Sequence, residues 1–128
     1  MWSNEYISIP YRPGGRDRYG CDCYGLVRLI LKERFDKLLP ELSYDHNDNE
    51  KLADLVDEQK PLLQAERVDK PREGDVVVMR FCGLPTHLGI MVDEYRFIHI
   101  SNVTHMSCIE RIDNTRVKDR IEGFYRVC

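Results

Sequence analysis

Cys21-Asp22-Cys23-Tyr24-Gly25-Leu26-Val27-Arg28-Leu29-Ile30 is the stretch around which this chain is organised. It follows a glycine-rich turn at residues 14–20. Its apolar side chains then recur at helical spacing, which predicts an amphipathic helix from residue 23 to about residue 38 or 39, before Pro40. Asp22 is a preferred N-cap residue. Cys23 therefore stands at or beside the first helical position, where the positive end of the helix dipole is expected to lower the pKa of its thiol.

Length and composition limit the possible functions. A chain of 128 residues with 42% hydrophobic residues predicts one folded domain spanning residues 1–128. The net charge is −3 and the basic residues are scattered among the acids, which argues against a nucleic-acid groove. No apolar run of about 18 residues is present, so no membrane span is expected. The first six residues lack a secretory signal pattern, so we expect synthesis in the cytoplasm without a signal peptide.

The five cysteines are an odd number without the spacing of a disulfide framework, which favours reduced thiols. The pair Cys21-x-Cys23 lacks a second ligand pair at matching spacing, so it is weak support for a zinc site and no metal is expected. Cys21 is interpreted as structural or incidental. Cys82, Cys108 and Cys128 have no assigned role.

The rest of the chain predicts an α+β fold. A short helix is expected at residues 48–58, an edge strand at 62–68, and further strands at 76–79, 87–92, 95–100, 106–112 and 123–127. These strands form an antiparallel sheet of about five strands. The helix at residues 23–38 is expected to pack on it, because both elements have an apolar face to bury.

Two histidines lie on consecutive predicted strands. Alternation puts His87 and His99 on one face of the sheet if the connecting segment has an odd number of residues, and it then sets them directly opposite each other, with Cβ atoms about 5 Å apart. A two-residue turn would separate them onto opposite faces. Two unrelated histidines with local hydrogen bonds are the alternative. Together with Cys23, the pair supplies the nucleophile, base and orienting group of thiol acyl chemistry.

Several motifs in this order resemble the NlpC/p60 family of cell-wall cysteine peptidases. They are Pro10-Tyr11-x-x-Gly14-Gly15, Gly20-x-Asp22-Cys23-x-Gly25-Leu26-Val27, Gly74-Asp75-Val76-Val77, His87-x-Gly89-Ile90 and Phe97-Ile98-His99-x-Ser101. The segment at residues 22–28 is also similar to that of small stand-alone members encoded with bacteriophage tail genes.

The resemblance implies a papain-like fold and a residue role for each motif. By motif position, Cys23 corresponds to the nucleophile, His87 to the general base and His99 to the residue that holds the base. Tyr11 corresponds to a tyrosine whose hydroxyl helps to stabilise the oxyanion. Asp22 and Tyr24 flank the nucleophile as candidate substrate-binding residues. Tyr24 stands where family members often have serine, and its ring could reshape the acyl-side subsite at the mouth of the groove.

The implied reaction is hydrolysis of an amide bond in peptidoglycan stem peptides, commonly between D-glutamate and a diamino acid, without a cofactor. One alternative is a thiol acyltransferase or amidase of the same fold, and another is a non-enzymatic tail assembly component. A cell-wall substrate without a signal peptide suggests delivery by a virion tail and association with phage tail proteins. Residues 45–57 could dock there, although a solvated loop and helix is the simpler interpretation.

Overall fold

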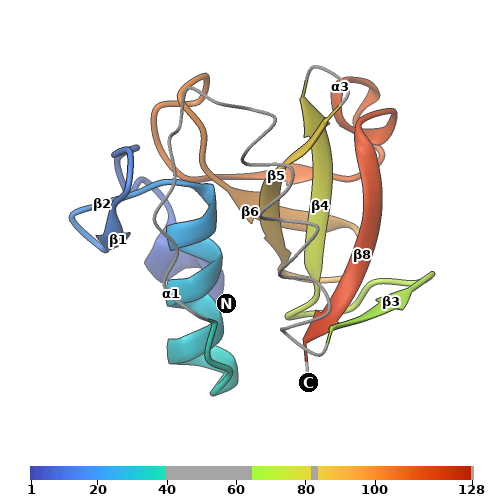
Figure 1. Ribbon diagram of the computed structural model, residues 1–128, viewed down its shortest axis with the longest axis horizontal. Coiled ribbons are helices and arrows are strands. Elements are labelled where there is room, and N and C mark those ends of the chain that lie inside the picture. Colours follow the sequence, from blue (N-terminus) through green and yellow to red (C-terminus); the bar gives the residue numbers. More distant parts are fainter. Residues whose placement is uncertain (40–64, 82–83, 128) are drawn as a thin grey trace.

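The computed structural model describes residues 1–39, 65–81 and 84–127, and its principal elements are one long helix and a six-stranded antiparallel sheet of order β3-β8-β4-β5-β6-β7. The elements are η1 (Trp2–Tyr6), β1 (Arg16–Asp17), β2 (Gly20–Cys21), α1 (Cys23–Phe35), β3 (Ala65–Val68), β4 (Val76–Phe81), β5 (Leu84–Met91), β6 (Arg96–His99), β7 (Cys108–Arg111), α3 (Thr115–Lys118) and β8 (Ile121–Val127). In Figure 1, α1 stands between the sheet and the small β1–β2 ribbon.

The α+β prediction is confirmed, because α1 packs on an antiparallel sheet. The sheet has six strands where about five were expected, and the predicted strands of its described part overlap the observed ones. The sequence did not indicate η1, the β1–β2 ribbon or α3. The predicted helix at residues 48–58 lies outside the described residues. No helix in the described ranges is long and apolar enough to cross a membrane.

The helix α1 ends at Phe35, before the predicted end at about residue 38 or 39. Asp36 adopts the left-handed conformation, with φ 53° and ψ 40°, and its backbone N–H donates to the carbonyl of Leu31. Aspartate tolerates this conformation better than most residues, so it can close a helix as glycine usually does. The helix therefore stops well before Pro40 is reached.

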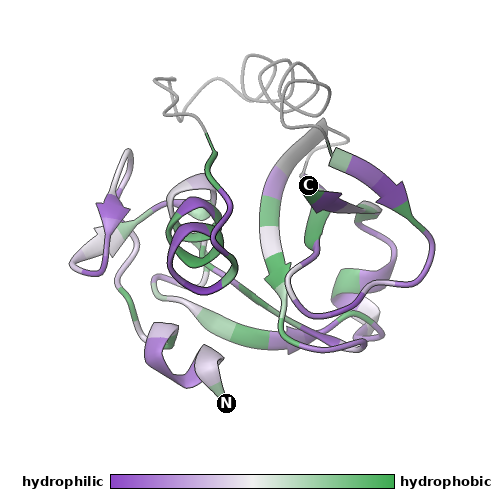
Figure 2. Ribbon diagram, turned by 90° about the horizontal axis from the view of Figure 1, so that it is seen from below, coloured by the Kyte–Doolittle hydropathy of each residue, from purple (hydrophilic) through white to green (hydrophobic). Residues whose placement is uncertain are grey.

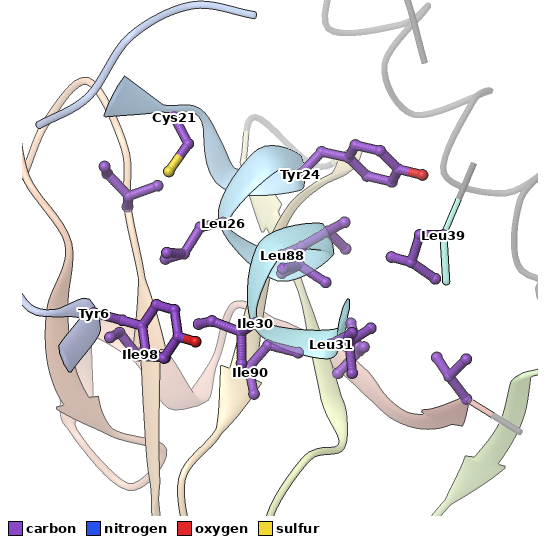
Figure 3. Packing of buried hydrophobic residues seen from close by; sticks show 14 of the residues in the cluster. Tyr6, Cys21, Tyr24, Leu26, Ile30, Leu31, Leu39, Leu88, Ile90 and Ile98 are labelled. Atoms are coloured by element: carbon purple, nitrogen blue, oxygen red, sulfur yellow. The ribbon is translucent and has the colours of Figure 1, made fainter. Parts of the chain in front are cut away.

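The main core lies between α1 and the near face of the sheet. Leu26, Ile30 and Leu31 of α1 are fully buried, and Figure 3 shows them close to the side chains of Leu88, Ile90 and Ile98. Viewed nearly end-on in Figure 2, α1 has hydrophilic as well as hydrophobic residues around its axis, as its amphipathic sequence predicts. A second cluster covers the other face of the sheet and consists of Val77, Met79, Met91, Phe97 and Val117.

The first turn of α1 is held against the preceding loop by a close backbone approach. A Cβ atom added at Gly25 would lie 2.1 Å from the carbonyl oxygen of Gly15, which no side chain could tolerate without a shift of the backbone. This contact requires glycine at position 25 and fixes the loop at residues 14–20 beside the helix start. The position of Cys23 therefore depends on packing as well as on helix geometry.

Candidate active site

Asp22 anchors the start of α1 and so places Cys23. One carboxylate oxygen of Asp22 accepts hydrogen bonds from the backbone N–H of Gly25 at 2.8 Å and from the Arg16 guanidinium at 2.8 Å, and the other accepts from the N–H of Gly14 at 3.2 Å. Asp22 is 2% exposed. The predicted N-cap is thus confirmed, and Cys23 is the first residue of the helix.

The surroundings of Cys23 favour its neutral thiol over the thiolate. Burial, followed by the negative charge of Asp22, raises its pKa to about 11. The backbone N–H groups of Leu88 and Tyr24 donate to the sulfur and oppose that rise without overcoming it. The lowered pKa expected at the helix start is therefore wrong, because burial and the charge of Asp22 outweigh the hydrogen bonds to the sulfur and the charge of Arg16. The contact with Leu88 also places the sulfur beside the backbone of β5, next in the chain to His87.

His87 and His99 share one face of the sheet but do not lie directly opposite each other. Gly89 pairs with His99, so His87 is offset from that pair by two residues along β5. The connecting segment is longer than expected, since the Asp93 carboxylate accepts from the backbone N–H groups of Tyr95 and Arg96 and holds an extended turn. The prediction that the two histidines lie directly opposite each other is wrong, whereas the prediction that they share one face of the sheet is confirmed.

The offset leaves the two imidazole rings in contact. The Nε2 atom of His87 lies 2.8 Å from the Nδ1 atom of His99, and the ring centroids are 5.1 Å apart. Gly89 lies between the two histidines on the same face, where a side chain would meet the Phe97 ring at 3.0 Å. Absence of a side chain at residue 89 therefore lets the Phe97 ring approach the strand closely at this point.

Glu110 is a further member of this cluster that the sequence analysis missed. Its Oε2 atom lies 2.5 Å from the Nε2 atom of His99, and its Oε1 atom lies 3.5 Å from the Arg116 guanidinium. Glu110 is on β7, which pairs with β6 so that His99 faces Cys108. Alternation along the predicted strand at residues 106–112 could have placed Glu110 on the histidine face, had its partner strand been known.

These contacts determine the proton positions in the hydrogen-bonded series His87–His99–Glu110, which we call the histidine relay. A carboxylate can only accept, so His99 donates its Nε2–H to Glu110. Burial lowers the pKa of His99, and burial followed by the charge of His99 lowers the pKa of His87 to about 3, so both rings are neutral near pH 7. The Nδ1 of His99 therefore accepts from His87 Nε2–H, and His87 Nδ1 carries the lone pair that a base needs.

The remaining predicted site residues differ in position. Tyr11 is half-buried and forms an isolated β-bridge with Cys21, two residues before the nucleophile. Burial, then the charges of Asp22 and Cys23, raise the pKa of its hydroxyl. Tyr24 is 5% exposed and belongs to the core, with the Arg16 guanidinium 5.5 Å from its ring centroid. The ring expected at the mouth of the groove is thus buried.

The other cysteines do not join the nucleophile. Cys21 is fully buried, and burial, with Asp22 next in importance, raises the pKa of its thiol to about 12, which supports a structural interpretation. Cys108 is half-buried beside His99. Cys82, Cys128 and the possible docking segment at residues 45–57 lie outside the described residues.

The raised pKa of Cys23 predicts slow alkylation near neutral pH. Because the thiolate is the reactive form, modification of Cys23 by iodoacetamide should be slow at pH 7 and should accelerate as the pH rises toward 11. Peptide mapping after brief labelling at several pH values measures this for each cysteine. Rapid labelling of Cys23 that is independent of pH between 6 and 8 would contradict a protonated resting thiol.

Comparisons with known proteins identify the family and the fold of this chain. The model of the NlpC/P60 family matches residues 8–126. The chain is 28% identical over 97 residues to a protein of Escherichia coli K12 named murein DD-endopeptidase MepS/murein LD-carboxypeptidase, covering 76% of this chain and 45% of that protein. It is 28% identical over 100 residues to a probable endopeptidase of Haemophilus influenzae Rd, covering 77% and 54%. The chain therefore spans about half the length of these relatives.

Solved structures share the fold at low sequence identity. The NlpC/p60 domain of the peptidoglycan hydrolase SagA superposes with a TM-score of 0.67 at 17% identity, covering 98% of this chain and 92% of that one. NlpC1 of Trichomonas vaginalis superposes with a TM-score of 0.72 at 19% identity, covering 97% and 41%. Because the family model matches nearly the whole length of this chain, the chain belongs to the NlpC/P60 family.

Proposed function

We propose that this protein is a cysteine peptidase that hydrolyses an amide bond in the stem peptides of peptidoglycan. The observation that carries the proposal is the ordered set of groups at the start of α1. Cys23 stands beside the backbone of β5, and the histidine relay continues from His87 through His99 to Glu110. Each group has the proton or lone pair that its role in thiol acyl transfer requires.

The reaction begins when His87 Nδ1 accepts the proton of the Cys23 thiol. The sulfur attacks the scissile carbonyl carbon, and the backbone N–H of Cys23, with the hydroxyl of Tyr11, stabilises the oxyanion. Protonated His87 then passes that proton to the leaving amine, and a water molecule hydrolyses the thioester. Because burial keeps the resting pair neutral, the thiolate forms only as His87 takes the proton, in step with attack of the sulfur on the carbonyl carbon.

The imidazolium that forms on His87 is stabilised along the relay. His99 Nδ1 accepts from His87 Nε2–H, and the Glu110 carboxylate accepts from His99 Nε2–H, so the negative charge of Glu110 is coupled to the new positive charge. Glu110 is therefore a positioning residue that acts through His99. This assignment gives the second histidine a defined direction of proton donation.

We propose the bond between D-glutamate and the diamino acid as the target, on the motif resemblance of this chain. The name of the Escherichia coli relative specifies DD-endopeptidase and LD-carboxypeptidase activities on murein. Tyr24 follows the nucleophile directly and is buried, so it affects the acyl-side subsite through packing and not as an exposed wall. Analysis of the products distinguishes these bonds.

Digestion of purified sacculi tests the proposal. The unaltered protein should release fragments whose new termini are D-glutamate and a free diamino acid, while Cys23→Ala should lower the rate by about a thousandfold or more. Cys21→Ala is the matched control, checked for folding by circular dichroism, and should remain active. Mass analysis identifies the new termini. An active Cys23→Ala variant, or products that carry an added competing amine, would contradict a cysteine hydrolase.

Variants along the relay should differ in severity. His87→Asn should lower the rate of hydrolysis by about a thousandfold or more, because the base exchanges a proton in every turnover. His99→Asn should keep partial activity. Glu110→Gln should reduce kcat about tenfold or more with little change in KM, since glutamine can donate to His99 and reverse its tautomer. Glu66→Gln, at an exposed strand position, is the matched control. Equal kcat values for Glu110→Gln and Glu66→Gln would exclude Glu110 from the relay.

We propose further that the protein acts from a virion tail and associates with tail proteins. The proposal is supported by the similarity of residues 22–28 to tail-encoded members of the family. Mass spectrometry of purified particles should then detect the chain at a fixed ratio to known tail proteins. Recovery only from the soluble fraction of the lysate would point instead to release during lysis or to a role in assembly.

A further inference from the structure

Three side chains able to bind a metal ion meet at the end of the histidine relay. Among the described residues, His99, Cys108 and Glu110 form a group whose ligand atoms all lie within 4.8 Å of one another. The Sγ atom of Cys108 lies 3.8 Å from His99 Nε2, and Glu110 Oε2 lies 2.5 Å from the same nitrogen. Cys108 has no role in the proposed hydrolysis, so its place beside these two relay residues is unexplained by it.

Strand pairing holds the three ligands on one face. Cys108 is the direct cross-strand partner of His99, and Glu110 follows two residues later on β7, so alternation points both β7 side chains the same way. Cys108 and Glu110 are half-buried, which leaves an approach from solvent, whereas His99 is 6% exposed. The ligands are therefore mounted on paired strands and not on a loop.

The ligand types fit zinc. Imidazole nitrogen, thiolate sulfur and carboxylate oxygen are its usual protein ligands, and three of them leave a fourth tetrahedral position for water. Tetrahedral zinc would hold neighbouring ligand atoms about 3.3 to 3.6 Å apart. The sulfur–nitrogen distance is already close to that range, and the oxygen–nitrogen pair needs to separate by less than about 1 Å. The second ring nitrogen of His99 is held by His87, as metal-binding histidines usually require.

We propose that His99, Cys108 and Glu110 bind Zn²⁺ and that the bound ion switches the histidine relay off. The regulatory part of this proposal rests on the proposed peptidase function, whereas the binding part does not. The proposal rests on three observations: the three ligands, the strand register that presents them, and the contact between His99 and His87.

The switch follows from the position of one proton. A zinc ion bound to His99 Nε2 takes the place of the proton on that nitrogen. Neutral His99 must then carry its single proton on Nδ1. His99 Nδ1–H then donates to His87 Nε2, and neutral His87 carries its own proton on Nδ1. That atom can no longer accept the proton of the Cys23 thiol, and the first step of hydrolysis stops.

The proton count balances. Cys108 releases its thiol proton to solvent when its sulfur binds the ion, while each histidine keeps one proton and only changes the nitrogen that carries it. Glu110 exchanges its hydrogen bond with His99 for a bond to zinc. No oxidant or reductant takes part, and removal of the ion by a chelator reverses every change.

Cobalt binding to the Cys23→Ala variant of the full chain tests the site without relying on activity. Co²⁺ should bind at one equivalent with a thiolate charge-transfer band and tetrahedral visible bands, and Zn²⁺ should displace it. The band should disappear in Cys23→Ala/Cys108→Ser and weaken in Cys23→Ala/Glu110→Gln. Absence of binding, or a band that persists in the Cys108→Ser variant, would overturn the site.

Inhibition of hydrolysis tests the switch. Zn²⁺ should inhibit the unaltered protein reversibly, and Cys108→Ser should keep its metal-free rate while requiring at least tenfold more Zn²⁺ for half inhibition. Equal sensitivity of the two proteins would mean that zinc acts at Cys23, and the switch would be wrong. If neither protein hydrolyses sacculi without metal, the proposed function fails, and the cobalt result still decides whether the site exists.

Discussion

The hydrogen bond between His99 and Glu110 determines the direction of proton donation along the histidine relay. Because the carboxylate cannot donate, the orientation of one ring is fixed, and the 2.8 Å contact between the histidines passes that choice to His87. Burial keeps both rings neutral, so the arrangement ends with a lone pair on the ring nitrogen of His87 that can serve the thiol. The pairing of β6 with β7 makes this contact possible, since it brings residues 99 and 110 to one face.

The nucleophile depends on a different constraint, at the other end of the site. Asp22 is almost fully buried, and its oxygens are occupied by Arg16 and two backbone N–H groups, which fixes the first turn of α1. The same negative charge raises the pKa of Cys23, although less than burial does. The position of Cys23 is thus fixed, but its thiol has a low reactivity at rest. The nearby base, His87, is needed to generate the thiolate.

Local signals predicted the parts of the fold and site that depend on nearby residues. Apolar spacing and an N-cap located the start of α1, and strand alternation put His87 and His99 on one face. The end of α1 was wrong because the left-handed Asp36 stops it before Pro40. The predicted register between β5 and β6 was wrong because the turn held by Asp93 adds residues to their connection. Glu110 and the raised pKa of Cys23 were missed because both depend on strand pairing and burial, which no single segment specifies.

Nitrogen-15 NMR of the histidine side chains near pH 7 tests the proton order of the relay most directly. His46→Asn and His105→Asn, both outside the relay, assist assignment of the four histidines. The account predicts that His87 and His99 are neutral and that each carries its proton on Nε2. A proton on Nδ1 of either ring in the metal-free protein, or a doubly protonated ring, would contradict it.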